Sequence, residues 1–457
     1  MIELDPDRMA AEAGATILQR GAGDGTRPDQ ATIDSREAGP GDLFFGLPGE
    51  HADGGRFAEA ALKRGAWGAV IGSGWAAELA GPGEVDGWIF ASEDPLASLQ
   101  KLARAWRLEI GCPLVGVTGS TGKTSVKDIT RSILPRRVHA SPENFNTEIG
   151  MPLSLLAAPL ETEILVMEMA MRGRGQIAEL CEIGEPDVAA ITNIGPVHLE
   201  LLGTIEAIAE AKAEILRGLG PEGRAVVPAG AETLQPHLTD DLDTTTFGTG
   251  GDVHAITATA FDGGIDALVS TPLGEAEFTF PFEEAHNLTN ALCAIAIGTT
   301  LGIEPGEMAP LTSRIQFSRL RGERVELQRE ILLLNDCYNA NPISMRAAIE
   351  HLALVPAPRR RVGILGGMAE LGPEGPRFHA EIAARARDLG VSPIIGVGDL
   401  ARDYAPDEWA PDPLAGAELA ERILGPGDVA LIKGSRSVGL EALTDALRAR
   451  LGEADER

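Results

Sequence analysis

The fold of this chain is decided by one stretch, Pro113-Leu-Val-Gly-Val-Thr-Gly-Ser-Thr-Gly-Lys-Thr-Ser-Val126. Leu114 to Val117 is a short run rich in β-branched residues, bounded by Pro113 and Gly119, which predicts a buried strand. From Ser125 onward, apolar residues recur at helical spacing as far as Ile133. The stretch therefore predicts a strand, a glycine turn and then a helix.

This order of elements indicates a phosphate cradle. Backbone N–H groups and the helix N-terminus would face the anion, Lys123 would reach the outer phosphates, and the Thr124 hydroxyl would bind Mg²⁺. The strict pattern places its first glycine where this chain has Val117, so the match is a variant, and an ordinary strand-to-helix turn is the alternative. The Lys-Thr pair after a predicted strand favours the cradle. Its residues are Gly119, Ser120, Thr121, Gly122, Lys123, Thr124 and Ser125.

Length and charge limit the kind of protein this chain can be. With 457 residues it is too long for one core, so two or three domains are expected. The 55 glycines and 30 prolines are typical of an α/β protein with many short connections. A formal net charge of −29 makes nucleic acid and anionic lipid poor partners, because phosphate backbones would be repelled.

Cysteine spacing and the chain start favour a cytoplasmic protein. The four cysteines form no C-x-x-C pair, which argues against a disulfide framework or a structural zinc site. The first seven residues are acidic where a signal peptide would be basic. The most apolar helix candidate, Leu288 to Ile303, is interrupted by Asn290 and Gly298, so we expect a core helix and no membrane span.

Residues 1–108 predict a small α/β domain with ligand-facing loops. Short segments that suit strands, among them Gly41–Leu47 and Trp67–Ile71, alternate with glycine-rich polar loops. Ser35 and Arg36 could hold a diphosphate through a hydroxyl and a fork of N–H donors. A solvated turn explains the same two residues equally well.

Residues 109–315 form the second unit, which contains the cradle. Ile164–Glu168 is an apolar strand with a carboxylate at its carboxyl end, the edge where ligands bind in open α/β sheets, so Glu168 is a candidate Mg²⁺ ligand. A second apolar strand, Val188–Ile194, is followed by His198, which we expect at the same edge. A structural histidine is the alternative for His198, and Lys212 alone would be interpreted as a surface lysine.

The second unit also contains two candidate nucleotide-binding asparagines, and the third unit has the strand pattern of an α/β domain. Asn287 and Asn290 lie three residues apart, so they share a helix face and could contact a base edge, unless they only cap the helix. In residues 316–457, strand-like segments alternate with helical ones, which predicts a doubly wound domain. Those segments are Ile331–Leu334, Arg361–Leu365, Ser392–Val397 and Val429–Ile432.

Taken together, these stretches resemble the Mur ligases, the ATP-dependent amide-forming enzymes of bacterial peptidoglycan synthesis, over nearly the whole chain. The resemblance rests on the Gly-Ser-Thr-Gly-Lys-Thr loop, Asn144–Gly150, Glu168, His198, His286-Asn287 with Asn290, and Asp336. Other segments are similar to the member that acts last, joining D-alanyl-D-alanine to UDP-N-acetylmuramoyl-tripeptide. They are Asp34-Ser-Arg36, Met171-Arg-Gly173, Tyr338–Pro342 and Lys433–Arg436. The chain departs from the family pattern at two positions, Ala170 for a glycine and Asn335 for an aspartate, and neither is an assigned ligand.

The resemblance implies an architecture and a set of residue roles. It implies a UDP-binding domain, a central P-loop domain with a mostly parallel sheet and a C-terminal Rossmann-like domain, in one monomeric chain. ATP would be held by the cradle, with Asn287 and Asn290 at adenine and Arg321 and Asp336 at the ribose. Two Mg²⁺ ions would be held by Thr124, Glu168, His198 and a carbamylated Lys212, of which His198 and Lys212, with Lys123, would be catalytic. Ser35 and Arg36 would bind the UDP group, and Asn144 and Thr147 the muramoyl side.

The implied reaction passes through an acyl phosphate, because a carboxylate must be activated before it can form an amide in water. Two alternatives remain open. One is the sister ligase that adds a diamino acid at the preceding step, which the absence of an Asp-Asn-Pro-Arg loop disfavours. The other is a P-loop ATPase switch or small-molecule kinase, which would leave Lys212 and Tyr338–Pro342 without a role.

Overall fold

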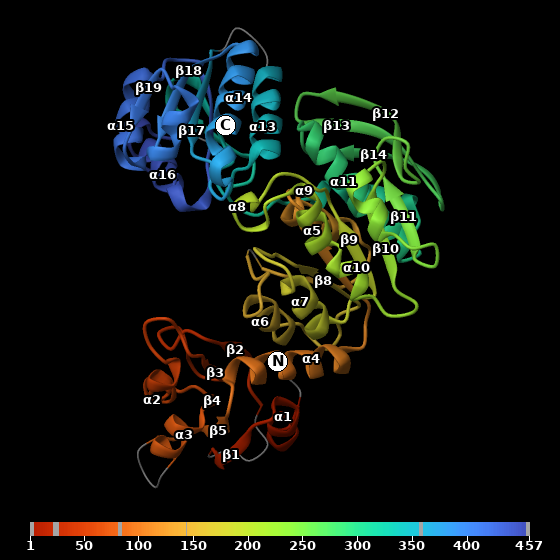
Figure 1. The fold of residues 1–457 in the computed structure, drawn as a ribbon, viewed down its shortest axis with the longest axis vertical. Helices are drawn as coiled ribbons and strands as arrows, with labels where there is room; N and C mark the ends of the chain where they lie inside the picture. The colour runs from red at the N-terminus through yellow and green to blue at the C-terminus, as the bar shows by residue number, and fades with distance from the viewer. Residues whose placement is uncertain (1–3, 22–26, 81–84, 143, 356–359, 454–457) are drawn as a thin grey trace.

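The computed structural model describes residues 4–21, 27–80, 85–142, 144–355 and 360–453, which fold around four β-sheets. Figure 1 shows three bodies along a curved path, from the red N-terminal part through the yellow and green middle to the blue C-terminal part. This is the mixed α/β architecture with mostly parallel sheets that the sequence predicts. We refer to the three bodies as the first, middle and C-terminal units.

The first unit has five strands in the order β1-β5-β4-β3-β2, and only β1 runs antiparallel to its neighbour. The strands are β1 (Thr16–Gln19), β2 (Gln30–Thr32), β3 (Asp42–Gly46), β4 (Gly68–Gly72) and β5 (Trp88–Ser92). The helices are α1 (Pro6–Ala13), α2 (Ala58–Lys63), α3 (Ser73–Leu79) and α4 (Pro95–Ile110). The strands predicted at Gly41–Leu47 and Trp67–Ile71 are confirmed as β3 and β4.

Helix α4 connects the first unit to the middle unit through a shared core. It begins at the N-cap Asp94, whose side chain accepts hydrogen bonds from two backbone N–H groups, and ends at Gly111 in a left-handed conformation. Trp106 is fully buried, and its Nε1 donates to the backbone oxygen of Ala158 over 3.0 Å. One continuous apolar cluster contains both Trp88 of the first sheet and Leu165 of the second. The first and middle units therefore share one apolar core.

The middle unit is built on a fully parallel sheet in the order β11-β10-β9-β6-β8-β7. Its strands are β6 (Leu114–Thr118), β7 (Val138–Ala140), β8 (Ile164–Glu168), β9 (Val188–Ile191), β10 (Arg224–Pro228) and β11 (Asp243–Phe247). Its helices are α5 (Lys123–Ile133), α6 (Gly150–Leu156), α7 (Gln176–Gly184), α8 (Leu199–Leu202), α9 (Ile205–Lys212), α10 (Glu214–Arg217), α11 (Ala285–Thr300) and α12 (Pro305–Met308). Strand β9 ends three residues earlier than predicted, which lengthens the loop that leads to His198.

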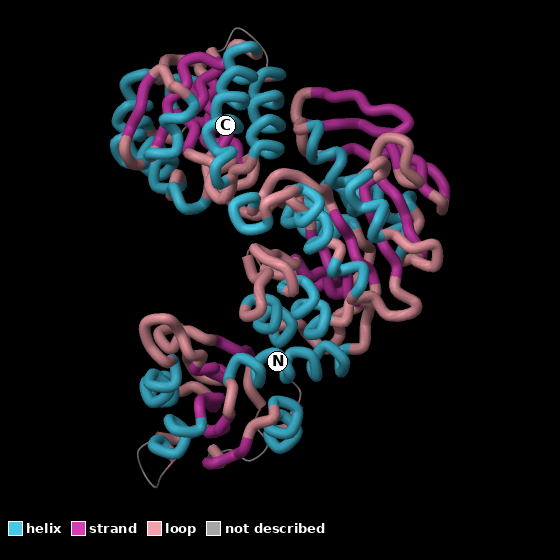
Figure 2. The backbone as a smooth tube through the Cα atoms, viewed as in Figure 1, coloured by secondary structure: helices cyan, strands magenta, loops and turns pink. Residues whose placement is uncertain are grey.

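A small antiparallel sheet in the middle unit was not predicted. It consists of β12 (His254–Phe261), β13 (Gly264–Thr271) and β14 (Gly274–Phe280), which Figure 2 shows beside α11. Helix α11 is buried at every position from Asn290 to Thr300, so the prediction of a core helix is confirmed. No helix in the described ranges is long and apolar enough to cross a membrane.

The C-terminal unit is doubly wound, as predicted. Its sheet has the order β15-β16-β20-β17-β18-β19, and only β15 is antiparallel. The strands are β15 (Glu323–Leu327), β16 (Ile331–Asn335), β17 (Arg361–Gly366), β18 (Val391–Val397), β19 (Glu408–Ala410) and β20 (Val429–Lys433). Helices α13 (Pro342–Leu354) and α14 (Gly375–Asp388) pack in one core cluster, and α15 (Pro413–Ile423) and α16 (Glu441–Leu451) in another.

Candidate active site

The glycine turn between β6 and α5 is shaped by close neighbours. A Cβ on Gly119, where φ is +148°, would lie 1.9 Å from Thr192 Oγ1, and one on Gly122, where φ is +77°, would lie 2.4 Å from Asn290 Oδ1. Both positions therefore require glycine, for the backbone conformation as well as for space. The strand, glycine turn and helix that the sequence predicts are present, and the turn lies against the residue that follows β9 and against α11.

Asn193 holds the turn from the segment after β9. Its backbone oxygen accepts from Ser120 N, and its Oδ1 accepts from Thr121 N, each over 3.0 Å. Lys123, the first residue of α5, folds back so that its Nζ donates to Gly119 O over 2.9 Å. Burial lowers the pKa of the Lys123 ammonium, an effect that nearby Glu168 opposes and Arg321 reinforces.

The carboxylate of Glu168 is buried at the end of β8 beside this turn. Its Oε2 accepts from Thr124 Oγ1 over 2.7 Å and its Oε1 from Asn146 Nδ2 over 2.8 Å. Arg321 Nη2 donates to the same Thr124 hydroxyl over 2.9 Å. The structure thus brings two of the predicted metal ligands into direct contact, with a guanidinium next to them.

His198 lies in a left-handed conformation, with φ at +53°, at the start of α8. Its Nδ1 is hydrogen-bonded to the Glu370 carboxylate of the C-terminal unit. Lys212, the last residue of α9, is only 1% exposed. Burial, and then the charge of Lys123, lower the pKa of the Lys212 amine well below its usual range. Burial lowers the pKa of His198, Glu370 opposes this effect, and the charges of Lys212 and Lys123 lower the pKa further, so the two amines lie within electrostatic range of the imidazole.

The predicted nucleotide residues form two groups. Asn290 Nδ2 donates to Asn287 Oδ1 over 3.1 Å, and Asn287 Nδ2 to Glu284 Oε2 over 3.3 Å. In the second group, Asp336 Oδ2 accepts from the buried Lys433 Nζ over 2.6 Å. The Arg321 guanidinium, which contacts Thr124, also lies 4.2 Å from the centre of the Tyr338 ring.

One cavity of about 820 Å³ between the middle and C-terminal units gathers most of these side chains. The predicted residues that line it are Ser120, Thr121, Gly122, Lys123, Thr124, Ser125, Asn144, Thr147, Glu168, His198, Asn287, Asn290, Arg321 and Asp336. Gly119 and Lys212 are not among its lining residues. The cavity has the size of a ligand site and combines cationic, anionic and amide groups.

Ser35 and Arg36 lie away from this cavity, in the turn after β2. Arg36 is exposed and pairs with Asp34, with 2.9 Å between Nε and Oδ1, which holds the pKa of Asp34 at about 2. Within the described ranges no contact joins these two residues to the cradle, and their predicted role at a UDP group stays a prediction.

Sequence reasoning did not assign Asn146, Asn193 or Glu370 to the site. Asn146 belongs to the polar loop after β7, where the density of amide and hydroxyl side chains was the available signal. Asn193 and Glu370 follow the strands β9 and β17, and the position of polar residues directly after buried strands could have identified them. Only the tertiary structure brings Glu370 to His198, because 172 positions separate the two residues.

The residues around Glu168 fit a hard divalent cation. A hydroxyl and a carboxylate are the oxygen donors that Mg²⁺ prefers, and such sites are usually completed by substrate phosphates and water. Among the described residues, no three His, Cys, Asp or Glu side chains cluster as a metal site on their own. An ion here would therefore depend on Thr124, on phosphates and on any anionic form of Lys212.

The fold and the cavity define a P-loop enzyme that binds a nucleoside triphosphate. Three family models match the chain: the Mur ligase family catalytic domain over residues 29–80, the Mur ligase middle domain over 117–298, and the Mur ligase glutamate ligase domain over 320–436. The chain belongs to the Mur ligase family, and it is an ATP-dependent ligase.

Named relatives and solved structures cover almost the whole chain. The UDP-N-acetylmuramoyl-tripeptide–D-alanyl-D-alanine ligase of Synechocystis sp. is 37% identical and covers 93% of this chain and 92% of its own. That of Bacillus subtilis is 34% identical, with coverages of 91% and 92%. The crystal structure of MurF ligase from Thermotoga maritima in complex with ADP is 30% identical, covers 93% and 98%, and has a TM-score of 0.80. A structure of MurF from Acinetobacter baumannii reaches 0.86 at 26% identity, with coverages of 97% and 98%.

Proposed function

We propose that this chain joins D-alanyl-D-alanine to UDP-N-acetylmuramoyl-tripeptide, with ATP converted to ADP and phosphate, to form UDP-N-acetylmuramoyl-pentapeptide. The relatives that match it over most of its length are named for this reaction. The observation that carries the proposal is that the phosphate cradle and polar residues of the C-terminal unit line the same cavity. The product is a precursor of the cell wall, on which cell shape and division depend.

The reaction proceeds in two transfers. The terminal carboxylate of the tripeptide attacks the γ-phosphorus of ATP, so that a carboxyl–phosphate bond forms as the bond to ADP breaks. The amine of the dipeptide then attacks the acyl carbon, loses a proton and displaces inorganic phosphate through a tetrahedral intermediate. Phosphoryl transfer depends mainly on positioning and charge neutralisation. Lys123 supplies a cation at the β- and γ-phosphates, and the backbone N–H groups of the cradle orient them.

Mg²⁺, when bound, would neutralise phosphate charge, and we propose Thr124, Glu168, His198 and a carbamylated Lys212 as the residues that hold two ions. The buried position of Lys212 supports the modification, because only an uncharged amine reacts with CO₂ and burial favours that form. Carbon-13 NMR of protein equilibrated with labelled bicarbonate tests it. A carbamate signal that is absent from Lys212→Met supports the modification, and identical spectra would argue against it.

We assign each unit a main substrate, and side chains of a neighbouring unit complete the binding of ATP and of the UDP-tripeptide. Residues 1–108 hold the UDP group through Ser35 and Arg36, residues 109–315 hold ATP, and residues 316–457 present the dipeptide. Asn287 and Asn290 take the adenine, Arg321 and Asp336 the ribose, and Asn144 and Thr147 the muramoyl side. We also infer a monomer, because residues of one chain complete the cavity, and a cytoplasmic location, which the four free cysteines support.

Phosphate release with each substrate omitted in turn tests the proposed function. A ligase releases phosphate in step with amide formation and needs both the UDP-tripeptide and the dipeptide. Release without either substrate would instead indicate a switch ATPase. Replacement of the dipeptide by a diamino acid, with UDP-N-acetylmuramoyl-dipeptide as the acceptor, tests the sister ligase reaction directly.

A further inference from the structure

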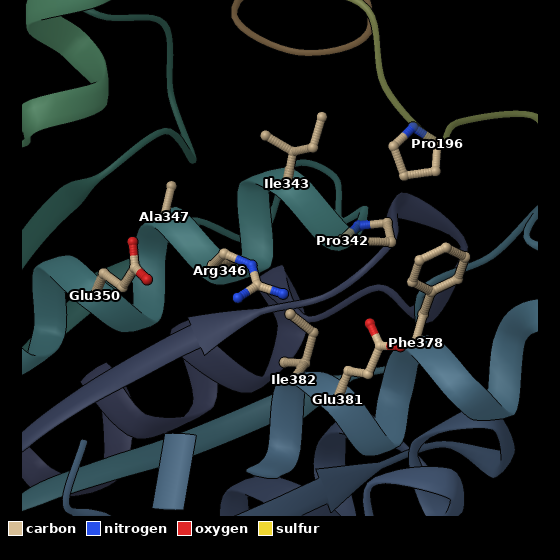
Figure 3. A pocket seen from close by; sticks show the side chains of 9 residues that line it. All are labelled: Pro196, Pro342, Ile343, Arg346, Ala347, Glu350, Phe378, Glu381 and Ile382. Carbon is tan, nitrogen blue, oxygen red and sulfur yellow. The ribbon is translucent and has the colours of Figure 1, made fainter. Parts of the chain in front are cut away.

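The loop from Gly195 to His198 belongs to the middle unit but lies against the C-terminal unit. A Cβ on Gly195 would come 2.0 Å from Cδ1 of Ile343, so the two units approach each other closely here. Figure 3 shows Pro196 across from Pro342 and Phe378, where a groove of about 380 Å³ runs along the seam. Leu199, directly after His198, packs against the apolar cluster of α13 and α14. The loop that carries His198 is therefore held by the other unit.

Glu370 makes the polar contacts of this seam. Its carboxylate is bonded to His198 Nδ1, and Arg172 Nε lies 3.8 Å from its Oε1. Its backbone oxygen accepts from Glu200 N over 3.2 Å. His198 and Glu370 both have left-handed backbones, with φ at +53° and +62°. This conformation is uncommon for residues with side chains, and paired strain across a unit boundary indicates a functional demand.

The loop that presents Glu370 is itself fixed. Met368 N donates to His379 Nε2 over 2.9 Å, and Ala369 N to Ser435 Oγ over 2.8 Å. The Glu370 side chain is 38% exposed, so an ion pair there would add little to stability. The effect of a rigidly presented carboxylate is instead on the orientation of the imidazole that it binds.

We propose that Glu370 is a positioning residue: its carboxylate binds Nδ1 of His198 and directs Nε2 into the cavity, so that the C-terminal unit completes the metal site only when it is docked. A carboxylate on one ring nitrogen of histidine determines the tautomer and leaves the other nitrogen as the ligand. This inference rests on the proposed role of His198 as a metal ligand. It adds that the role depends on a residue from a different unit of the chain.

Direct metal binding tests the inference without reliance on turnover. Mn²⁺ binding to the full chain is measured by electron paramagnetic resonance in the presence of ADP, for wild type, Glu370→Ala, Glu370→Gln and His198→Ala. Loss of a carboxylate that orients a metal-binding histidine weakens metal binding about 10–100-fold, which we expect for Glu370→Ala. Glu370→Gln should recover much of the affinity, because its amide oxygen can still accept from Nδ1–H.

Glu374→Ala is the matched control, since Glu374 is exposed and pairs with Arg377 within the C-terminal unit. It should bind Mn²⁺ as wild type does, and unchanged thermal midpoints would show that all variants fold. Normal Mn²⁺ binding by Glu370→Ala together with weak binding by His198→Ala would overturn this inference alone. Normal binding by His198→Ala would remove the proposed metal role of His198, and this inference with it.

Discussion

At the scale of single residues, the candidate site combines a buried carboxylate with two buried amines whose pKa is lowered by burial. Glu168 is buried among hydrogen-bond donors, and the amines of Lys123 and Lys212 are both depressed in pKa by burial. Such a cluster is typical of a functional site.

Replacement of Lys123 by alanine should remove catalysis and leave the fold intact. The ammonium group supplies charge where phosphoryl transfer needs it, and loss of one such donor costs about 100- to 1,000-fold in kcat. Steady-state phosphate release measures the effect, and a thermal melt checks the fold. Lys101→Ala, on an exposed position of α4, is the control. Near-normal turnover by Lys123→Ala would refute its assigned role.

Lys212→Met should lose turnover and gain stability. Burial of the Lys212 amine, which is only 1% exposed, costs free energy, and its replacement by an apolar side chain of similar length should add about 1–3 kcal/mol to the free energy of unfolding. Chemical denaturation measures the gain and the ligase assay the loss. A variant that is less stable yet fully active would show that the amine has a structural role only.

At the scale of elements, strand ends and the loops that follow them determine which side chains meet. The sequence predicted β6, β8, β16, β17, β18 and β20 from short apolar runs, because a strand buried on both faces needs such residues along its whole length. It did not predict β12 to β14, because β12 is mostly exposed and exposed or half-buried positions interrupt the buried ones in β13 and β14, which dilutes the apolar signal. The length of the loop after β9 depends on where pairing with β6 ends, which is a tertiary property.

The loop after β17 should loosen in acid. His379 is buried and uncharged, donating from Nδ1 to Gly375 O over 2.6 Å and accepting at Nε2 from Met368 N. Burial lowers its pKa below the usual value of about 6.5. At a pH between the lowered pKa of the folded state and the value of about 6.5 in the unfolded state, the unfolded state binds more protons. Stability therefore falls as the pH decreases below about 6.5.

Denaturant titrations from pH 7 to pH 5 measure this dependence. His379→Gln should be less stable by about 1–3 kcal/mol, because hydrogen bonds are lost, and should show a smaller decrease in acid. His51→Gln, at an exposed position of the first unit, should keep the wild-type pH dependence. An unchanged decrease in His379→Gln would assign the acid sensitivity to other groups.

At the scale of the whole molecule, the three units meet at two junctions of different character. The first and middle units share an apolar core around α4, whereas the middle and C-terminal units meet along the cavity and the seam at Glu370. A junction that shares an apolar core behaves as the interior of a domain, whereas a junction lined by a cavity permits relative motion more readily. We therefore expect relative motion between the middle and C-terminal units, and not between the first and middle units.

Trp106→Ala should destabilise the first and middle units together. The indole is fully buried and hydrogen-bonded, and its removal should cost about 3–5 kcal/mol. Hydrogen exchange should accelerate in β3 to β5 and in β6 to β9 but not in β16 to β20. Leu108→Ala, 46% exposed on the same helix, is the control. Faster exchange in only one unit would show that the two units unfold independently.

The sequence alone determined the class of fold, the strand-turn-helix of the cradle and the candidate ligand Glu168, because each of these depends on neighbours within a few residues, whereas the candidate role of Lys212 came from the family resemblance. Glycines, Lys123 and Thr124 are adjacent in the chain, and the strand that ends in Glu168 is recognisable from its own composition. Only the tertiary structure decided that Arg321 reaches Thr124, that Lys212 is buried near Lys123, and that Glu370 meets His198. These contacts join residues of separate elements and units, and the packing of sheets and helices that creates them is not encoded in any local pattern.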